Sequence, residues 1–248
     1  MQGERRTPLR PGPALRALGL LFGDAQTVRE HAAFAAASDA AVDLPRGDGH
    51  PVMFLPAFAM GDNALWPMAR AIGRLGYAVH GWDQGRNLGL SVRVLERLFA
   101  HAQHLGDQHA KTISLIGWSA GGLYAREIAR RRPGLVRRVI TLATPIRPNE
   151  VGVAGAERWI RTVDRLRATF GDPAFSPSLE APRVPTTAIH SKSDAVVPWR
   201  SALEVEGPCT ENIEVAEGHL ALGASVQVLR ILAARLAVAP APASDDSS

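Results

Sequence analysis

The sequence predicts an α/β fold in which helices cover both faces of a mostly parallel central sheet. From His50 onward, short apolar runs alternate with longer segments whose apolar residues recur at helical spacing, which is the pattern of repeated strand and helix units. The run 112–117 is apolar enough for a central strand buried on both faces. With 248 residues and 46% hydrophobic content, the chain can bury one large core, and we expect one domain.

The predicted elements follow each other in a regular order. The first strand spans 51–55, and the helix after it begins near Asn63 or later, because Pro67 fits only a first helical turn. Gly76 is the residue expected just after the end of that helix. The remaining strands are expected at 77–82, 112–117, 136–143, 186–190 and 212–215, and the remaining helices at 92–104, 120–132 and 224–236.

Three segments fall outside this alternation. Residues 1–48 form an N-terminal extension, with an amphipathic helix over 24–39, that we expect to pack on the domain spanning 49–238. Residues 145–184 are an insertion predicted to form a small helical cap. Residues 239–248 alternate proline with alanine and then turn acidic, a composition typical of a disordered tail.

The charge pattern favours a solvated basic surface over a nucleic-acid binding site. The formal net charge is only +4, and most of the positive charge is arginine. The clusters 130–132 and 137–138 carry no interleaved aromatic residues, so we interpret them as solvated surface and expect no nucleic-acid partner. No apolar run approaches the length of a membrane span and no export signal is visible. We therefore expect a cytoplasmic location without stable membrane insertion, and the sequence carries no signal for an oligomeric state.

The sequence lacks the residue patterns that disulfide frameworks, metal sites and common cofactors require. Cys209 is the only cysteine, which excludes an internal disulfide framework and a thiolate-rich metal site, and we expect it to be buried. His101, His104 and His109 have no H-E-x-x-H pattern and no supporting carboxylates, so we interpret them as solvated helix residues and expect no metal. Because neither a G-x-G-x-x-G after a strand nor a phosphate-binding loop is present, no cofactor is expected.

Ser119 lies in the run Gly117-Trp118-Ser119-Ala120-Gly121, a G-x-S-x-G pattern between a predicted strand and a predicted helix. In this context the serine falls on a tight turn that exposes its side chain above the sheet. Such a turn strains the backbone and crowds the positions two before and two after the serine, so glycine is needed at both. The N–H of Ala120, at the helix N-terminus, then points toward a reacting carbonyl oxygen.

The downstream sequence supplies a base and an acid for this serine. A serine hydroxyl needs a base within hydrogen-bond reach, and the base needs an orienting acid. Asp194 follows the strand 186–190 and His219 follows the last strand, so both lie at carboxyl ends of strands, where open α/β sheets place their sites. An aspartate there is also a common turn former, and a single histidine is often a packed side chain. The order Ser, Asp, His in three matching contexts favours a catalytic triad.

These features resemble the α/β-hydrolase superfamily, and within it the small bacterial serine esterases and lipases. The resemblance covers residues 50–236. It includes the run 81–87, which follows a predicted strand, and the run 139–145, which comes after the predicted helix 120–132. It implies an α/β-hydrolase fold with a small helical cap. It also places Asp83, Arg86 and Asn87 near the substrate entrance, where they either contact substrate or tie their loop to the rim of the sheet.

The same resemblance implies a second oxyanion donor from the loop after the first strand. The family has a His-Gly-x segment there, and this chain has Pro56-Ala57-Phe58 instead. A backbone donor requires no particular side chain, so we expect the oxyanion hole to be formed by the N–H groups of Phe58 and Ala120. Because His and Gly are absent, the resemblance does not define the geometry of this loop.

The predicted cap carries an apolar stripe that includes Trp159, Val163 and Phe170, opposite several arginines. As part of a cap, these side chains are expected to face an acyl group together with Trp118. The alternative is that the stripe only closes the core, and spacing alone does not separate the two possibilities.

The residues together predict a serine hydrolase that cleaves a small-molecule carboxylic ester through an acyl-enzyme on Ser119. A transferase or a thioesterase would use the same triad, because they differ only in the acyl acceptor or the acyl donor. A non-catalytic binding module on a hydrolase scaffold is the alternative from another class, since a fold does not fix a function.

Overall fold

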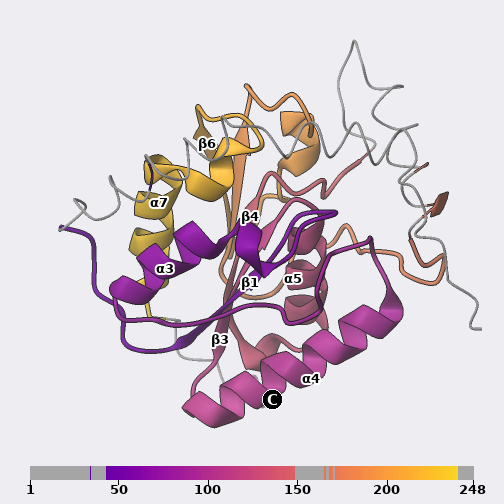
Figure 1. Cartoon of the computed structure of the whole chain (residues 1–248). Helices are drawn as coiled ribbons and strands as arrows, with labels where there is room; N and C mark the ends of the chain where they lie inside the picture. The colour runs from indigo at the N-terminus through magenta and orange to yellow at the C-terminus, as the bar shows by residue number, and fades with distance from the viewer. Residues whose placement is uncertain (1–33, 35–42, 149–164, 166–167, 170, 240–248) are drawn as a thin grey trace, which may run out of the picture.

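Six parallel strands form the centre of the structure, in the spatial order β2-β1-β3-β4-β5-β6 (Figure 1). The computed structural model describes residues 34, 43–148, 165, 168–169 and 171–239. The strands are β1 (Pro51–Leu55), β2 (Ala78–His80), β3 (Ile113–Trp118), β4 (Val136–Leu142), β5 (Thr186–Ser191) and β6 (Thr210–Val215). The expected α/β architecture with a parallel sheet is therefore confirmed.

Helices lie on both faces of the sheet (Figure 1). The α-helices are α3 (Trp66–Arg74), α4 (Val92–His109), α5 (Ala120–Arg131) and α7 (Val226–Leu236), and the short 3-10 helices are η1 (Asp62–Ala64), η2 (Pro133–Leu135), η3 (Trp199–Ala202) and η4 (Ala221–Ala224). Pro67 lies in the first turn of α3, as its fixed φ requires. Gly76 follows that helix with a φ of 99°, a value that glycine adopts without steric cost.

Successive residues of the central strands feed two separate cores. Phe54 of β1 and Ile116 of β3 face α3 and α7, whereas Leu55 and Leu115 face α4 and α5. All six residues of β3 are buried, because a strand covered on both faces has no solvent side. Phe34, the one described residue of the N-terminal extension before residue 43, is 2% exposed and belongs to the core of the α3 and α7 face.

Several element boundaries differ from the prediction, and for two of them a tertiary contact gives the reason. β2 stops at His80, because the next amides turn away from the sheet: the N–H of Trp82 donates to Asp62 Oδ1 at 2.8 Å. α4 continues to His109, past the predicted end at residue 104, because Leu105 still packs into the core at 3% exposure. In both cases a tertiary contact sets the boundary where local sequence gives no stop signal.

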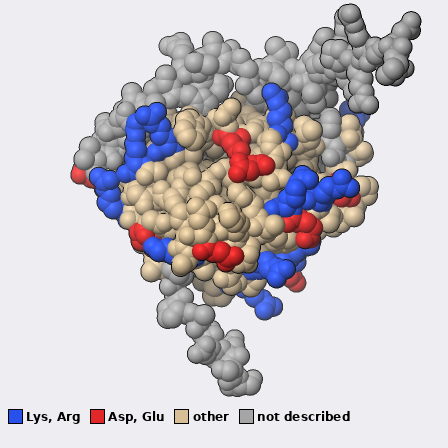
Figure 2. Space-filling view, turned by 60° about the horizontal axis from the view of Figure 1, so that its bottom comes forward, with Lys and Arg blue, Asp and Glu red and all other residues tan. Residues whose placement is uncertain are grey.

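The arginine pair after α5 is buried, which corrects the interpretation of this cluster as solvated surface. Arg137 and Arg138, in β4, are 8% and 4% exposed. Arg137 forms an ion pair of 2.9 Å with Asp48, and Arg138 donates to the Val238 carbonyl at 2.7 Å. On the face seen in Figure 2, basic and acidic side chains lie interspersed around an uncharged centre, so the arginine excess is not gathered into one patch there.

Cys209 is exposed, so the expectation that it is buried was wrong. It stands just before β6, where its carbonyl accepts the N–H of Thr186 at 2.7 Å. This position holds the backbone in the sheet while the side chain stays outside the core. Among the described residues, no helix has the length and apolarity needed to cross a bilayer.

Candidate active site

Backbone strain gathers at the carboxyl edge of the sheet. Of the five described residues other than glycine that have a left-handed φ, four follow β1, β2, β3 and β4 respectively: Ala59 (63°), Asp83 (56°), Ser119 (51°) and Ala143 (44°). The fifth is Ala110 (49°), the C-cap residue of α4. Such conformations cost about 1–3 kcal/mol each and persist only where the surroundings enforce them. This edge is therefore the place where the fold maintains unfavourable geometry, as sites commonly do.

Ser119 occupies the turn that the sequence predicts, directly after β3 and directly before α5. Its backbone has φ 51° and ψ −121°. The Ser119 N–H donates to the Leu142 carbonyl at 2.8 Å, and its own carbonyl accepts the N–H of Gly122 at 3.0 Å. These two hydrogen bonds hold the strained residue between β4 and the first turn of α5, with its side chain at the helix N-terminus.

Three glycines let the chain pass through this turn. A Cβ on Gly117 would lie 2.3 Å from the Gly122 Cα, and one on Gly121 would lie 2.2 Å from the Leu55 carbonyl oxygen. These are the two glycines expected from the pattern. Gly122 was not singled out by sequence, although a Cβ there would lie 1.9 Å from Thr144 Oγ1. The start of α5 thus approaches both β1 and the segment after β4 at distances that only glycine permits.

Asp194 is held in the loop after β5 by its own turn. Its N–H donates to the Ser191 carbonyl at 3.2 Å, and its Oδ1 accepts the N–H groups of Val196 and Val197 at 2.7 Å each. The side chain is 1% exposed. With Oδ1 occupied by the backbone, Oδ2 is the oxygen left to receive a further donor.

That donor is His219, which the sequence places after β6. Its Nδ1 lies 2.7 Å from Asp194 Oδ2, and its side chain is 3% exposed. Because a carboxylate only accepts hydrogen bonds, Nδ1 carries a proton, and Nε2 of the neutral ring is an acceptor. The loop is anchored to α7, since Glu217 accepts a hydrogen bond from Ser225, the N-cap residue of that helix.

Trp118 connects His219 to the turn at Ser119. It is the last residue of β3, immediately before Ser119, and its ring centroid lies 6.0 Å from that of His219. Its residue exposure is 3%, so the indole packs beside the imidazole more than it lines an open surface. The expected contact between Trp118 and substrate stays a prediction.

The loop that carries Phe58 is fixed by one buried residue, Asn87. The Asn87 side chain donates from Nδ2 to the Pro56 carbonyl at 2.8 Å, and its backbone N–H donates to Met60 at 2.8 Å. Its carbonyl accepts the N–H of Ala59 at 2.6 Å. Sequence reasoning left open whether Asn87 contacts substrate or ties its loop to the sheet rim, and this geometry favours the second possibility. Asp83 and Arg86, which lie in the same loop as Asn87, are exposed.

Tyr124 of α5 holds the far end of the loop that carries Asn87. Its hydroxyl donates to the Gly89 carbonyl at 2.9 Å and accepts the N–H of Ser91 at 2.8 Å. Burial raises the pKa of Tyr124 to about 12, so the phenol keeps its proton over the physiological range. No sequence signal marks this residue, because Tyr124 reads as an ordinary apolar position of an amphipathic helix.

The expected cap residues Trp159, Val163 and Phe170 lie outside the described residues. The described part of the insertion includes the return segment before β5, which Arg126 of α5 binds. Arg126 donates to the carbonyls of Ser178 and Glu180 at 2.8 and 2.9 Å. It also forms a bidentate ion pair with Glu204, from Nε to Oε2 at 2.7 Å and from Nη2 to Oε1 at 3.0 Å. Both side chains are 0% exposed.

Asp48, His50 and Ser114 form a hydrogen-bonded network at the amino ends of the strands, on the opposite side of the sheet from Ser119. His50 Nδ1 lies 2.5 Å from Asp48 Oδ1, and His50 Nε2 lies 2.8 Å from Ser114 Oγ. Both His50 and Ser114 are 0% exposed. Burial lowers the pKa of His50, against the opposing effect of its bond to Asp48. Hydrogen bonds from His50 hold the Asp48 pKa well below its usual range, although partial burial opposes them.

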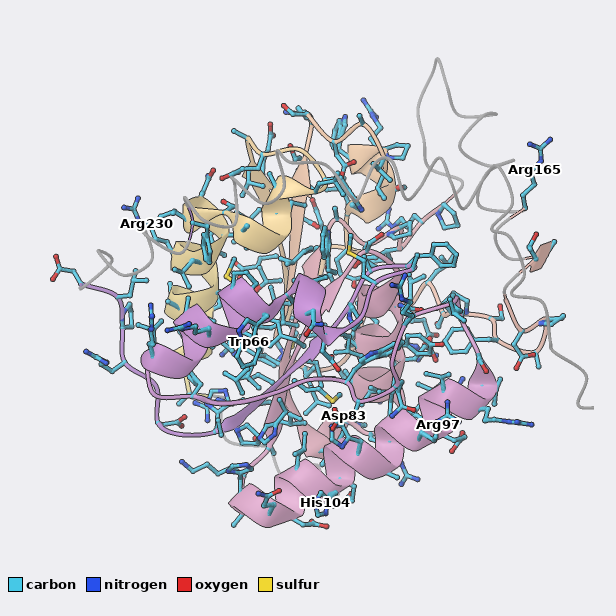
Figure 3. All side chains as sticks on the ribbon, viewed as in Figure 1. Trp66, Asp83, Arg97, His104, Arg165 and Arg230 are labelled. Carbon is cyan, nitrogen blue, oxygen red and sulfur yellow. The ribbon has the colours of Figure 1, made fainter. Side chains whose placement is uncertain are left out.

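The α4 histidines differ in their surroundings. His104 is exposed on the side of α4 away from the sheet, as expected (Figure 3). His101 and His109 are half-buried: His101 Nε2 lies 3.2 Å from the Gly81 carbonyl, and His109 Nε2 lies 3.1 Å from His80 Nε2. Across the described residues, no three His, Cys, Asp or Glu side chains are grouped so that they could hold a metal ion.

No family model and no curated protein sequence matches the chain. Solved structures do match. Lipase B of Aspergillus fumigatus aligns over 82% of this chain with a TM-score of 0.58 and 16% identity, and the chain spans only 57% of that lipase's length. A lipase-esterase related protein from Clostridium acetobutylicum ATCC 824 aligns over 78% of this chain and 96% of its own, with a TM-score of 0.56 and 14% identity.

A thioesterase domain from the curacin biosynthetic pathway aligns over 77% of this chain and 92% of its own, with a TM-score of 0.53 and 15% identity. At such low identity these similarities define the fold. The chain has the α/β-hydrolase fold, as the sequence resemblance implied.

Proposed function

We propose that the protein is a serine hydrolase that cleaves carboxylic esters through an acyl-enzyme on Ser119. The observation that carries this proposal is the 2.7 Å hydrogen bond between His219 Nδ1 and Asp194 Oδ2, at the sheet edge where Ser119 occupies a strained turn. The packing of His219 on Trp118, the neighbour of Ser119, adds support. The fold shared with lipases and an esterase-related protein points in the same direction.

In this mechanism, Ser119 Oγ attacks the ester carbonyl carbon while His219 Nε2 takes the hydroxyl proton. Asp194 orients the imidazole and stabilises its charged form. The N–H groups of Ala120 and Phe58 hold the oxyanion of the tetrahedral intermediate. As the intermediate collapses, the bond to the alcohol oxygen breaks and the imidazolium protonates the leaving alcohol. Water then attacks the acyl-enzyme by the same route, which releases the acid and restores the serine hydroxyl.

The first test replaces the nucleophile. Ser119→Ala is expected to lower kcat for a short p-nitrophenyl ester by about three to six orders of magnitude, because the acyl-enzyme no longer forms. Ser114→Ala is the matched control: it removes a serine hydroxyl that is hydrogen-bonded to His50, at a buried position remote from the proposed chemistry. That variant is expected to lose stability and to keep the wild-type kcat. Ester turnover that survived Ser119→Ala would refute the proposal.

A fluorophosphonate probe tests the nucleophile without knowledge of the substrate. The probe reacts only with an activated serine, so peptide mapping is expected to find the adduct on Ser119 and none on the buried Ser114. An unlabelled but folded wild-type protein would instead favour a binding module on a hydrolase scaffold.

A thioester is the second candidate substrate, and the similarity to a thioesterase domain favours it. The triad chemistry is the same for both acyl donors, so substrate preference must be measured. Comparing kcat/KM for a matched acyl-thioester and oxygen ester of the same chain length decides between them. Product analysis with an added alcohol shows whether water or the alcohol resolves the acyl-enzyme.

A further inference from the structure

We propose that Asn87 is a positioning residue for the oxyanion hole, which holds the loop 56–60 in place against the nucleophile helix α5. The inference rests on the proposed function, because it concerns how that site stabilises the oxyanion. It assigns a role to a residue that touches neither the nucleophile nor the acid and base.

The loop 56–60 needs an external constraint. It turns tightly, since the Met60 N–H donates to the Ala57 carbonyl at 3.0 Å, and Ala59 has a left-handed φ of 63°. An L-residue with a side chain disfavours this conformation. The segment also lacks the glycine that the related His-Gly-x loops carry, so its own sequence does not favour the turn that it adopts.

Asn87 supplies that constraint from the neighbouring loop. It is 0% exposed and contacts both ends of the turn. Its backbone binds Ala59 and Met60, at 2.6 and 2.8 Å, while its side-chain Nδ2 donates to the Pro56 carbonyl at 2.8 Å. Its Oδ1 accepts the N–H of Gly89 at 3.2 Å. The backbone N–H and carbonyl and the side-chain Nδ2 of this residue thus fix the two loops to each other, while Oδ1 binds within its own loop.

The carbonyl that Asn87 binds is also one that packs against the start of α5. A Cβ on Gly121 would lie 2.6 Å from the Pro56 oxygen and 2.2 Å from the Leu55 oxygen. The Asn87 side chain therefore holds the Pro56 carbonyl against the N-terminal end of α5, where Ala120 lies. A movement of Pro56 changes the distance between the two amides proposed to bind the oxyanion.

The loop of Asn87 is in turn fixed to α5 itself. Tyr124 of that helix binds the Gly89 carbonyl and the Ser91 N–H through its hydroxyl. The hydrogen bonds thus run from α5 through Tyr124 and the 87–91 segment to Pro56. The Leu55 and Pro56 carbonyls also pack directly on Gly121 of α5. The loop 56–60 is therefore connected to α5 in two ways, through Asn87 and through this direct contact.

These two connections predict that a loosened loop lowers kcat and leaves KM nearly unchanged. An oxyanion hole is matched to the tetrahedral intermediate and not to the ground-state ester, so a displaced donor lowers kcat while KM changes little. Removing one donor outright costs about 10²–10³-fold in kcat. Loosening its position is expected to cost less, about 10- to 100-fold.

The experiment replaces Asn87 with aspartate. Asn87→Asp keeps the acceptor for Gly89 and removes the donor to Pro56. The matched control is Asn212→Asp, because Asn212 likewise bridges backbone groups: it accepts the Glu204 N–H at 2.8 Å and donates to the Glu204 carbonyl at 3.1 Å. Both variants lose one donor to a carbonyl, but only Asn87 borders the oxyanion loop.

For Asn87→Asp we expect a kcat for p-nitrophenyl ester hydrolysis that falls by about 10- to 100-fold with a nearly unchanged KM. The inhibition constant of a trifluoromethyl ketone, which forms a tetrahedral adduct with the serine, should rise in parallel with the loss of kcat/KM. Asn212→Asp should lower Tm without either kinetic change. Equal kinetics in the two variants, or a loss confined to KM, overturns the assignment.

Asn87→Ala is the second variant, since it removes the donor without adding a charge, and it is expected to show the same kinetic selectivity. If both Asn87 variants fail to fold while Asn212→Asp folds, the side chain serves the whole domain and the assignment is also overturned. Wild-type labelling at Ser119 is measured first. Its absence is a failure of the proposed function, whereas labelling with unaltered Asn87 kinetics is a failure of this inference alone.

Discussion

The glycine at the start of α5 offers a direct test of how closely the site is packed. Gly121→Ala would place a Cβ 2.2 Å from the Leu55 carbonyl oxygen and 2.6 Å from that of Pro56. Both contacts are with backbone, so no side-chain rotation relieves them. Restoring an ordinary contact of 3.4 Å or more requires a displacement of about 1 Å, and a misplacement of that size at a catalytic centre costs about 10²-fold in rate.

The same substitution has an expected cost in stability. Overpacking of a tight core position costs about 1–3 kcal/mol, and each kcal/mol lowers Tm by about 2–4 °C for a domain of this size. Gly134→Ala is the matched control, because no heavy atom lies within 4 Å of a Cβ built at that position in η2. Steady-state ester hydrolysis and thermal unfolding of both variants give the two quantities.

The reasoning fails if Gly121→Ala hydrolyses esters at the wild-type rate with an unchanged Tm. It fails in part if Tm falls and the rate does not, because the contact would then matter to the fold but not to the geometry of the site. A loss of activity in Gly134→Ala equal to that in Gly121→Ala would mean that the assay responds to any added methyl group.

Two further predictions concern groups away from the nucleophile. Arg126→Met should lower the free energy of unfolding by about 3–5 kcal/mol, because it leaves Glu204 charged and buried, and the double variant with Glu204→Leu should lose less; urea denaturation that found the double variant less stable than the single one would contradict this. Burial lowers the pKa of His50 below 6.5, so the unfolded chain binds a proton there at a pH where the folded protein does not. The resulting stability is complete above pH 6.5 and is lost as the pH falls below it. His80 and His190 shift in the same direction, so His50→Gln should make the acid-side loss of stability shallower without abolishing it.

The sequence predicts most of the fold because the four inner strands, β1, β3, β4 and β5, are buried along their whole length. Strands covered on both faces are rich in apolar residues, and some of the turns between elements carry proline or glycine where the backbone demands them, as at Pro67 and Gly76. The boundary of β2 was not predictable in this way. Its end depends on Asp62, which captures the amide of Trp82 from another loop, and no local pattern encodes that contact.

The same distinction applies to the candidate site. Ser119, Asp194 and His219 are indicated by sequence because each follows a strand and the carboxyl ends of parallel strands meet at one edge. Asn87 and Tyr124 are not, because their importance lies in the particular carbonyls that they bind. The pairing of Arg137 with Asp48 was missed for a related reason: local charge counting sees a basic cluster, whereas burial and a distant partner are properties of the folded chain.

The network of Asp48, His50 and Ser114 shows what distinguishes a proposed active site from a structural network of the same residue types. In the chain of His50 and Ser114, both side chains are fully buried and the histidine Nε2 is already bonded to the serine. Ser114 lies within β3 and not, like Ser119, at the N-terminus of a described helix, where the helix dipole could stabilise an oxyanion. Ser119 is partly exposed on a strained turn, at the N-terminus of α5 and beside the loop fixed by Asn87. Accessibility and the neighbouring backbone donors, more than the identity of the three side chains, are therefore the grounds for assigning the chemistry to Ser119.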